Sequence, residues 1–179
     1  NPLSVYVQTK LEGEHAVRSE NLEAIIARVN FYGWSLSGKR SLSEFFFNNL
    51  LAGNPVMGFT DVFFCPLHVN ELANIIFRML ESKLTGLYHV VNQECVSKYE
   101  FGVRLARRFN FEEQLIKPTS VDEAGLKAAR SPRLTLATGK LKEDLTISLP
   151  DLSSGLDRFY SQYLSGYPEQ LREMLPPAA

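Results

Sequence analysis

The sequence Asn-Pro-Leu-Ser-Val-Tyr-Val-Gln-Thr-Lys-Leu-Glu-Gly-Glu occupies residues 1–14, and the interpretation of the whole chain starts from it. Tyr6 and Lys10 are four residues apart within it. In a helix, this spacing puts both side chains on one face, about one turn apart. A cation beside a phenol favours the phenolate, so the hydroxyl can exchange a proton with a substrate alcohol or carbonyl. Taken alone, this spacing more often marks an exposed helix with an incidental lysine, so it indicates only a candidate acid–base pair. The helix that carries it would be capped by Ser4 and would end near Ser19.

A strand follows this helix in the predicted order. Residues 24–30 mix apolar and β-branched types, as buried parallel strands do. From its start to the end of this strand, the chain contains four features in order: Pro2, Tyr-x-x-x-Lys, Leu-x-Gly-Glu at 11–14, and Arg-x-Asn-x-Tyr-Gly at 28–33. Together they resemble the extended short-chain dehydrogenase/reductases, and within that family the dTDP-4-dehydrorhamnose reductase type of sugar-nucleotide enzyme. The resemblance extends to about Leu156.

The resemblance implies an α/β fold with a partial Rossmann-like parallel sheet and a small carboxy-terminal substrate lobe. Residues 1–60 would end the dinucleotide-binding domain, and residues 61–179 would mix substrate-lobe segments with returning sheet segments. No Gly-x-Gly-x-x-Gly turn opens the chain to cradle a pyrophosphate. We therefore expect the carboxy-terminal part of a larger enzyme, whose amino-terminal strands are missing here, and we expect the isolated 179-residue chain to be inactive.

The resemblance also implies the cofactor and the site residues. The cofactor of the intact parent would be NAD or NADP, and the residues that select between the two would lie outside this chain. Tyr6 and Lys10 would be catalytic, and Lys10 would also hold the nicotinamide ribose. The expected cofactor-binding residues are Tyr6, Lys10, Asn30 and Phe31. The expected substrate-binding residues are Asn30, Tyr32 and Arg130.

Each of these assignments has a structural alternative. Tyr6 and Lys10 could share an exposed helix by chance. Phe31 and Tyr32 could be core residues at a strand end, and Arg28 is equally an ion-pair partner or a ligand. The loop at residues 34–40 contains Lys39 and Arg40, which could bind a substrate diphosphate or face solvent.

The substrate class follows from the resemblance and is a sugar nucleotide or a related carbonyl compound. Residues 61–69 match the family's Asp-Gln-x-x-x-Pro-Thr-x-Val segment only in part, since Val62 and Leu67 replace polar residues. These replacements weaken the expectation of a dTDP-sugar. A reductase is favoured, with two alternatives: an epimerase or dehydratase, and a non-catalytic regulatory subunit of the same fold. A degenerate or split protein without a cofactor site is a further possibility.

Composition sets the remaining expectations. The 179 residues are 45% hydrophobic with a net charge of −1, which gives no electrostatic reason to expect binding to nucleic acid or an anionic membrane. No apolar run approaches the ~20 residues of a membrane span. Cys65 and Cys95 are too few for a disulfide framework, so a reducing cytoplasm and two buried thiols are expected. The three histidines are scattered, and no metal site is predicted.

Periodicity, capping residues and proline positions predict the other elements. The expected helices cover residues 41–50, 70–81, 97–109, 121–124, 140–145, 151–164 and 168–175. The expected strands cover residues 56–59, 86–92 and 116–118. A severed sheet would leave an open edge and an apolar face. We therefore expect either that the isolated chain is unstable, or that the missing amino-terminal half or a second copy of the chain covers them.

Overall fold

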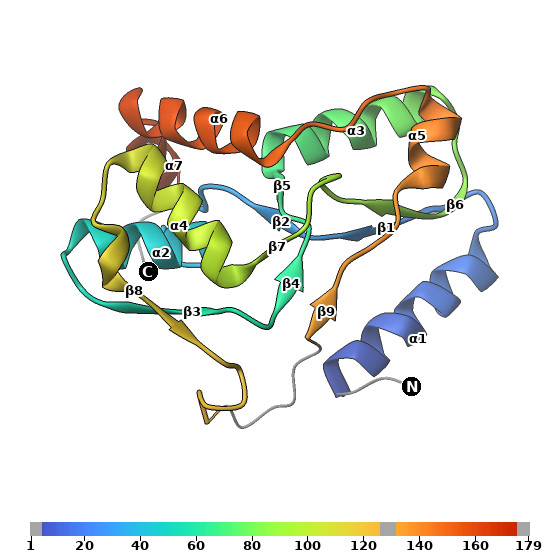
Figure 1. Ribbon diagram of the computed structural model, residues 1–179. Coiled ribbons are helices and arrows are strands. Elements are labelled where there is room, and N and C mark those ends of the chain that lie inside the picture. Colours follow the sequence, from blue (N-terminus) through green and yellow to red (C-terminus); the bar gives the residue numbers. More distant parts are fainter. Residues whose placement is uncertain (1–4, 126–131, 175–179) are drawn as a thin grey trace, which may run out of the picture.

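A computed structural model describes residues 5–125 and 132–174 (Figure 1). Its helices are α1 (Val5–Glu20), α2 (Leu42–Leu51), α3 (Val69–Glu81), α4 (Lys98–Phe109), η1 (Glu113–Leu115), α5 (Gly139–Leu145), α6 (Leu152–Leu164) and α7 (Tyr167–Glu173). Its strands are β1 (Ile25–Val29), β2 (Phe31–Tyr32), β3 (Val56–Phe59), β4 (Phe63–Phe64), β5 (Leu67–His68), β6 (Gly86–Val90), β7 (Val96–Ser97), β8 (Ile116–Thr119) and β9 (Arg133–Leu134).

Parallel pairing dominates the strands. β1 runs parallel to β6, in a register that sets Ile25 against Gly86 and Val29 against Val90. β2 pairs in parallel with β5, and β3 with β8. β4 is the exception, because it pairs antiparallel with β7 and parallel with β9. Strands alternate with helices along the chain, so the predicted α/β class is confirmed.

One hydrophobic cluster joins the β1–β6 pair to α3 and α5. Leu72, Ile75 and Met79 lie three or four residues apart on α3, which places them on one face of the helix. They pack against Tyr88 and Val90 of β6. In Figure 1, α3 lies on one side of the β1–β6 pair and α1 on the other.

A second, aromatic cluster joins α2, α4 and α6 to β3 and β8. Phe46, Phe101 and Phe159 are almost fully buried in it. The ring of Trp34 stacks on that of Phe159 with centroids 4.0 Å apart. Gly102 lets α4 approach α2 closely, because a Cβ at this position would come 2.6 Å from the ring of Phe46. This cluster fixes the lobe on the left of Figure 1.

Side-chain caps begin several of the described helices, and the cap expected at Ser97 is confirmed. The side chains of Ser41, Ser97 and Asp151 each accept a backbone N–H at the start of their helix. Glu100 occupies the capping-box position three residues after Ser97, which would suggest a reciprocal bond, but its carboxylate pairs with Arg104 instead. The Ser4 cap lies outside the described residues.

Two kinds of element differ from the prediction. The helix expected at residues 121–124 is wrong, because this segment forms turns. There, the backbone N–H of Val121 and the hydroxyl of Ser120 donate to the Asp61 carboxylate instead of continuing a helix. The strands β2, β4, β5 and β7 were not predicted. Each is only two residues long, which is too short for a periodic pattern.

Charge, rather than apolar burial, attaches α1 to the sheet. None of the 16 residues of this helix is buried. The guanidinium of Arg28 on β1 donates to both carboxylate oxygens of Glu14, at 2.8 and 2.7 Å. The hydrogen bond from Arg28 is the main cause that lowers the pKa of Glu14. Of the two alternatives for Arg28, the ion pair is therefore the one that the structure contains.

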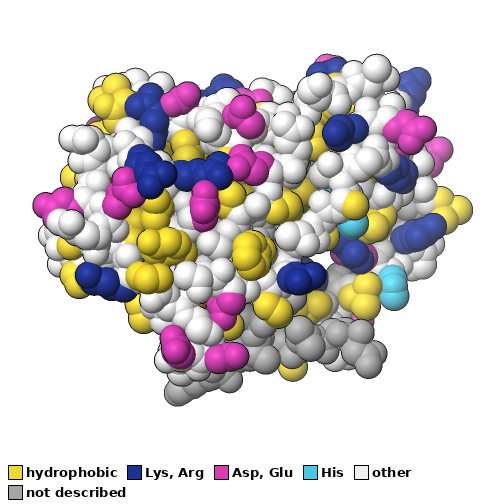
Figure 2. Space-filling view, in the orientation of Figure 1, with side chains coloured by type: hydrophobic (Ala, Val, Ile, Leu, Met, Phe, Trp, Pro, Cys, Tyr) yellow, Lys and Arg dark blue, Asp and Glu magenta, His cyan; other side chains and the backbone are white. Residues whose placement is uncertain are grey.

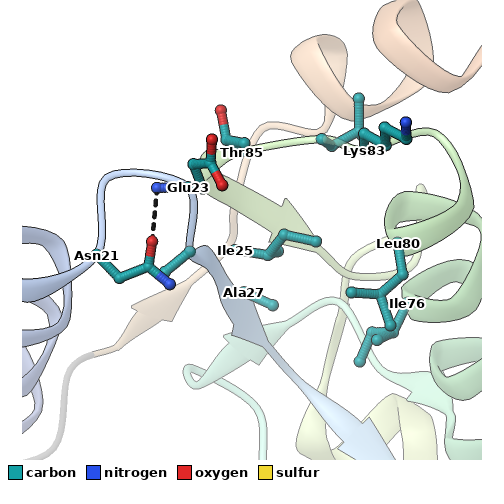
Figure 3. Close-up of a pocket in the computed structure, with 10 residues that line it drawn as sticks. Asn21, Glu23, Ile25, Ala27, Ile76, Leu80, Lys83 and Thr85 are labelled. Carbon is teal, nitrogen blue, oxygen red and sulfur yellow. Dashed lines mark hydrogen bonds between the residues drawn. The ribbon is translucent and has the colours of Figure 1, made fainter.

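An open apolar groove borders β1. Within the described ranges, β1 has a strand partner only in β6. A groove of about 660 Å³ lies beside β1. Figure 3 shows Ile25 and Ala27 of β1 on one side of it and Ile76 and Leu80 of α3 on the other. The open edge and the apolar face expected of a severed sheet are thus both present. A missing half or a second copy as their cover remains a prediction, as does the domain division near residue 60.

Ion pairs link several charged side chains on the surface of helix α4. Arg104, Arg107 and Arg108 of α4 each contact a carboxylate. Figure 2 shows basic and acidic side chains interleaved over this part of the surface. None of the helices in the described ranges combines the length and the apolar character that a membrane crossing requires.

The aromatic cluster predicts a large difference between two phenylalanines. Phe159→Ala should lower the free energy of unfolding by about 3–5 kcal/mol, because it leaves a cavity where the side chain is fully buried. Phe77→Ala on α3 is the matched control, since Phe77 is 63% exposed and its loss should cost well under 1 kcal/mol. Urea denaturation of both variants measures the difference. Equal effects would contradict this packing.

The α1 attachment predicts a second pair of variants. Glu14→Gln should speed hydrogen exchange of the α1 amides roughly two- to fivefold, because a surface pair contributes about 0.5–1 kcal/mol. Glu12→Gln is the control, because Glu12 accepts a hydrogen bond from Gln8 of its own helix and, within the described ranges, forms no ion pair with the sheet.

The pH dependence of this attachment follows from the lowered pKa of Glu14. The attachment should be complete above the usual glutamate value of 4.5 and should weaken as the pH falls below it. Hydrogen exchange of the wild type across this range measures the effect. Exchange that is independent of pH there, after correction for the intrinsic rate, would contradict the role of the ion pair.

Candidate functional site

Tyr6 and Lys10 lie side by side on α1. The ammonium nitrogen of Lys10 is 5.6 Å from the centroid of the Tyr6 ring. Tyr6 is 69% exposed, and Lys10 is exposed as well. The predicted spacing therefore gives two neighbouring groups that a ligand can reach. Their catalytic role remains a prediction.

Asn30 and Phe31 follow the carboxyl end of β1, where open α/β sheets bind ligands. The side-chain amide of Asn30 donates to the backbone carbonyl of Leu134 at 2.8 Å, and the backbone carbonyl of Asn30 accepts the N–H of Leu67 at 2.9 Å. Asn30 thus holds three segments together. Phe31 is 56% exposed, so its ring can meet a ligand. Leu134 belongs to β9, which the sequence reasoning did not connect to this strand end.

The assignment of Tyr32 as a substrate-binding residue is wrong in this structure. Tyr32 is fully buried and packs edge-on against His68, Phe101 and Phe159. Burial raises the pKa of its hydroxyl, which therefore stays protonated. Of the two alternatives stated above, Tyr32 is therefore a core residue, whereas Phe31 is exposed.

Burial also sets the protonation state of His68, whose ring packs against Tyr32. Its side chain is 1% exposed, and desolvation lowers its pKa to about 4. Its Nδ1 accepts the backbone N–H of Asn70 at 3.4 Å and so caps α3. His68 is therefore neutral near pH 7 and helps to shape the core behind the strand end.

A buried carboxylate organises the loop at residues 34–40. Glu44 is fully buried. It accepts the backbone N–H groups of Ser35, Arg40 and Ser41 and the hydroxyl of Ser35, at 2.6 to 3.0 Å. This role of Glu44 was missed, although Ser41-x-x-Glu44 matches the capping-box pattern. The loop is therefore fixed in shape by a negative charge beneath it.

A pocket of about 360 Å³ opens between this loop and the end of β2. Phe31, Trp34, Arg40 and Leu42 line it together with Ser35, Ser41, Gly33 and Val69. It therefore combines apolar and aromatic walls with one cation. The pocket is large enough for part of a small-molecule ligand.

The segment at residues 61–69 contributes to packing. The Asp61 carboxylate accepts from Ser120 and Val121, and the bond from Ser120 is the main cause that lowers its pKa. Val62 and Leu67 are almost completely buried. Their apolar side chains therefore fill the core and do not face a ligand in this structure. Arg130 lies outside the described residues.

The expectation for the cysteines is wrong. Cys65 and Cys95 form a disulfide, with Cα atoms 4.1 Å apart. Cys65 is fully buried as expected, but Cys95 is exposed. The bond depends on the pairing of β4 with β7, which no local pattern in the sequence indicates. In the described ranges, no group of three or more His, Cys, Asp or Glu side chains is arranged to hold a metal ion.

The described residues fit one end of a nicotinamide dinucleotide. Lys10 offers an exposed ammonium that can donate to ribose hydroxyls, and Tyr6 offers an exposed hydroxyl beside it. Phe31 has an exposed aromatic ring after the carboxyl end of β1. The sequence contains no glycine-rich turn for the pyrophosphate. The donor set thus suits the ribose and nicotinamide end of the cofactor.

Solved structures share this fold. A dTDP-4-dehydrorhamnose reductase from Bacillus anthracis, in complex with NADP, superposes with a TM-score of 0.83 at 23% identity; the match covers 90% of this chain and 57% of that one. A Clostridium acetobutylicum dTDP-4-dehydrorhamnose reductase gives 0.82 at 22% identity, over 92% and 57%. The fold is therefore the Rossmann-like α/β fold of these reductases.

Sequence comparison identifies curated relatives. The chain is 29% identical over 170 residues to the probable low-salt glycan biosynthesis reductase of Haloferax volcanii. That match covers 92% of this chain but only 57% of the relative. The chain is also 30% identical over 141 residues to the methionine adenosyltransferase 2 subunit beta of Bos taurus. This match covers 74% of this chain and 41% of that protein. The chain thus spans little more than half the length of the first relative.

A match to a family model shows which protein family the chain belongs to. The model described as the RmlD substrate binding domain matches residues 1–165, which is most of the chain. This range contains α1 with Tyr6 and Lys10, the strand end with Asn30 and Phe31, and the pocket beside Arg40. This protein therefore belongs to the RmlD substrate-binding-domain family.

Proposed function

We propose that the intact protein is an NAD(P)-dependent reductase of a sugar nucleotide or a related carbonyl compound. The observation that supports it is the exposed pair of Tyr6 and Lys10 on α1, with the ammonium of Lys10 close to the Tyr6 ring. Family membership and the NADP-bound Bacillus anthracis structure support it further. Because the chain spans only part of its relatives' length, the activity is proposed for the whole protein.

The two side chains on α1 have distinct roles in this proposal. The bound nicotinamide would supply the hydride. The Tyr6 hydroxyl donates a proton to the oxygen of the substrate carbonyl that becomes an alcohol. The ammonium of Lys10 donates hydrogen bonds to the ribose hydroxyls and stabilises negative charge on the Tyr6 oxygen after the proton has left. Both groups are solvent-accessible, so a substrate can reach them.

The substrate would lie along the carboxyl end of β1 and β2. Phe31 offers an exposed ring, and Arg40 offers a cation in the adjoining pocket. An aromatic ring and a guanidinium suit a nucleotide with a negatively charged diphosphate. Asn30 acts in this proposal by fixing the strand end, since its side-chain amide is bonded to Leu134. Arg130 remains a proposed substrate ligand from the sequence resemblance alone.

A reductase is favoured over an epimerase or dehydratase by the Leu-x-Gly-Glu motif after Lys10 and by the Asp61, Pro66 and Val69 positions. The relatives that resemble the chain in sequence also include a reductase by name. A location in the cytoplasm and independence of nucleic acid and membranes remain expectations from composition.

A non-catalytic subunit is the second candidate. Its support is the 30% identity to a protein named as the beta subunit of methionine adenosyltransferase 2. In this case the intact protein would bind a partner enzyme and would not turn over nucleotide sugars. Co-purification with a larger enzyme, with no nicotinamide oxidation on any nucleotide sugar, would favour this candidate over the reductase.

The reductase proposal predicts the effect of Tyr6→Phe in the intact protein. Turnover should fall by roughly 10²- to 10⁴-fold, because the proton donor is lost while the ring remains. Tyr160→Phe on α6 is the matched control and should leave turnover unchanged, since that ring packs under Arg108 in the other lobe. Steady-state oxidation of NADPH with a dTDP-4-keto sugar measures both. Near-full activity of Tyr6→Phe would refute the assignment.

The cofactor proposal predicts a difference between the isolated chain and the intact protein. The isolated chain should bind NADPH only weakly, because no glycine-rich turn is present to hold the pyrophosphate. The intact protein should bind it at least roughly 100-fold more tightly, since loss of several phosphate contacts costs about 3 kcal/mol or more. Fluorescence titration measures both affinities. Tight binding to the isolated chain would reveal a phosphate site that this proposal does not contain.

A further inference from the structure

The disulfide between Cys65 and Cys95 is built into the strand register. In the antiparallel pair of β4 and β7, Phe63 lies opposite Ser97 and Phe64 lies opposite Val96. The next pair in this register is Cys65 opposite Cys95, and their Cα atoms are 4.1 Å apart. Directly opposed residues in an antiparallel pair have Cα atoms about 4.5–5.5 Å apart. The two cysteines therefore meet because the backbone pairing brings them together.

The two cysteines differ sharply in access. Cys65 is fully buried behind Pro66 and Leu67, which are also buried. Cys95 is exposed and immediately precedes β7. Thiol–disulfide exchange needs an attacking thiolate to reach one of the two sulfur atoms. Only the Cys95 side of this bond is open to a thiol from solvent.

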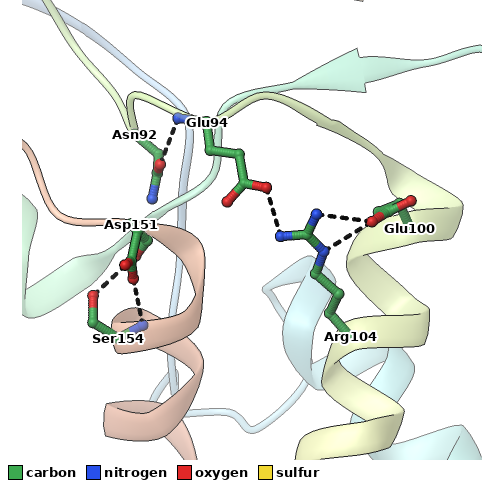
Figure 4. A network of polar contacts seen from close by, with 6 residues as sticks. All are labelled: Asn92, Glu94, Glu100, Arg104, Asp151 and Ser154. Atoms are coloured by element: carbon green, nitrogen blue, oxygen red, sulfur yellow. Dashed lines mark hydrogen bonds and ion pairs between the residues drawn. The ribbon is translucent and has the colours of Figure 1, made fainter.

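The bond joins the loop after β6 to the segment between β4 and β5. We define the loop as residues 91–95. Figure 4 shows its polar contacts: the side chain of Asn92 accepts the backbone N–H of Glu94, whose carboxylate pairs with Arg104 on α4. Arg104 also pairs with Glu100 of its own helix. The ion pair is partly exposed and therefore weak. The disulfide is the strong link between this loop and β4.

Hydrogen bonds connect this link to the candidate site. The backbone N–H of Asn92 donates to the carbonyl of Cys65 at 3.2 Å. Two residues further along, the N–H of Leu67 donates to the carbonyl of Asn30 at 2.9 Å. The disulfide thus lies at the same carboxyl edge of the parallel strands as Asn30. A change in the bond would act on the backbone that holds this strand end.

We propose that Cys65 and Cys95 form a reversible thiol–disulfide site, at which a small thiol of the glutathione class reacts at Cys95. The bond acts as a latch that holds residues 91–95 against the β4–β5 segment when oxidised and releases them when reduced. This inference is independent of the proposed reductase activity, because it rests only on the two cysteines and their contacts.

The chemistry of the latch balances with two thiols. A first thiolate attacks the Cys95 sulfur, so that a mixed disulfide forms there and the Cys65–Cys95 bond breaks. The electron pair leaves on the Cys65 sulfur, which takes a proton. A second small-molecule thiolate attacks the small-molecule sulfur of this mixed disulfide. This releases the small-molecule disulfide and the Cys95 thiolate, which takes a proton. Two electrons pass from the two thiols to the protein disulfide.

Glutathione buffers test the site on the intact protein. The protein is incubated at a series of reduced-to-oxidised glutathione ratios, quenched with acid, alkylated and analysed by peptide mass spectrometry. We expect a linked Cys65–Cys95 peptide under oxidising conditions, its reversible loss under reducing conditions, and glutathione on Cys95 in roughly tenfold excess over Cys65 because access controls the reaction. Absence of the linked peptide at every ratio, or glutathione mainly on Cys65, would overturn the proposal.

Two single-cysteine variants test the difference in accessibility between Cys65 and Cys95. In Cys65→Ser, the remaining Cys95 should accumulate a mixed disulfide with glutathione. In the matched Cys95→Ser, the remaining Cys65 should be alkylated at least roughly tenfold more slowly than Cys95 in the first variant, because it is buried. Equal rates in two variants that keep the wild-type circular dichroism would contradict the difference in access. If either variant fails to fold, alkylation rates of the two thiols in the reduced wild type give the same comparison.

Hydrogen exchange tests the latch itself. Reduction of the wild type should speed exchange at the amides of Asn92 and Lys98, which bond to Cys65 and Val62, by roughly tenfold, while the β1–β6 amides stay unchanged. Glu94→Gln is the control, because it removes the ion pair to Arg104 and keeps the disulfide. Oxidised Glu94→Gln should exchange like the oxidised wild type. No change on reduction, or equal loosening in oxidised Glu94→Gln, would show that the disulfide is not the latch.

Discussion

Parallel backbone pairing between β1 and β6 is the constraint on which the rest of the molecule depends. It brings two segments about 60 residues apart into one register and points their carboxyl ends in the same direction. Asn30 and the loop at residues 91–95 therefore lie at one edge. The same pairing presents an apolar face to α3 and leaves Arg28 to contact α1 from the opposite face. The candidate site and the core are thus two results of one pairing.

The two parts of the candidate site are held in different ways. The strand end at Asn30 is hydrogen-bonded to β5 and β9, and Tyr32, two residues further on, is fully buried, so backbone bonds and packing fix its position. Helix α1, which carries Tyr6 and Lys10, has no buried residue and is tied by the Arg28–Glu14 pair. Catalytic groups need positions accurate to about 0.5 Å, which packing and further contacts usually provide. The open groove beside β1 is a surface on which further protein could supply them.

Polar and covalent contacts within loops shape the surroundings of this edge. The Glu44 carboxylate gathers backbone N–H groups from Ser35, Arg40 and Ser41, so a buried negative charge determines how the loop that carries Arg40 is presented. Burying such a charge is tolerable only because several donors surround it. The disulfide performs a comparable task on the other side of the strand end, where it joins residues 91–95 to β4. Both contacts fix loops that regular secondary structure leaves free.

The sequence by itself determined the α/β class, the long helices and strands, the family and the candidate pair on α1. These features depend on spacing and capping within a few residues, as in the apolar stripe of α3 or the Ser41 cap, and such local patterns are visible in the chain. The tertiary structure alone decided that Tyr32 is core and Phe31 is exposed, and that Asn30 is bonded to Leu134. It alone paired Cys65 with Cys95. These outcomes depend on which distant segments pack together, and two-residue strands such as β4, β5, β7 and β9 carry no periodic signal from which that packing could be predicted.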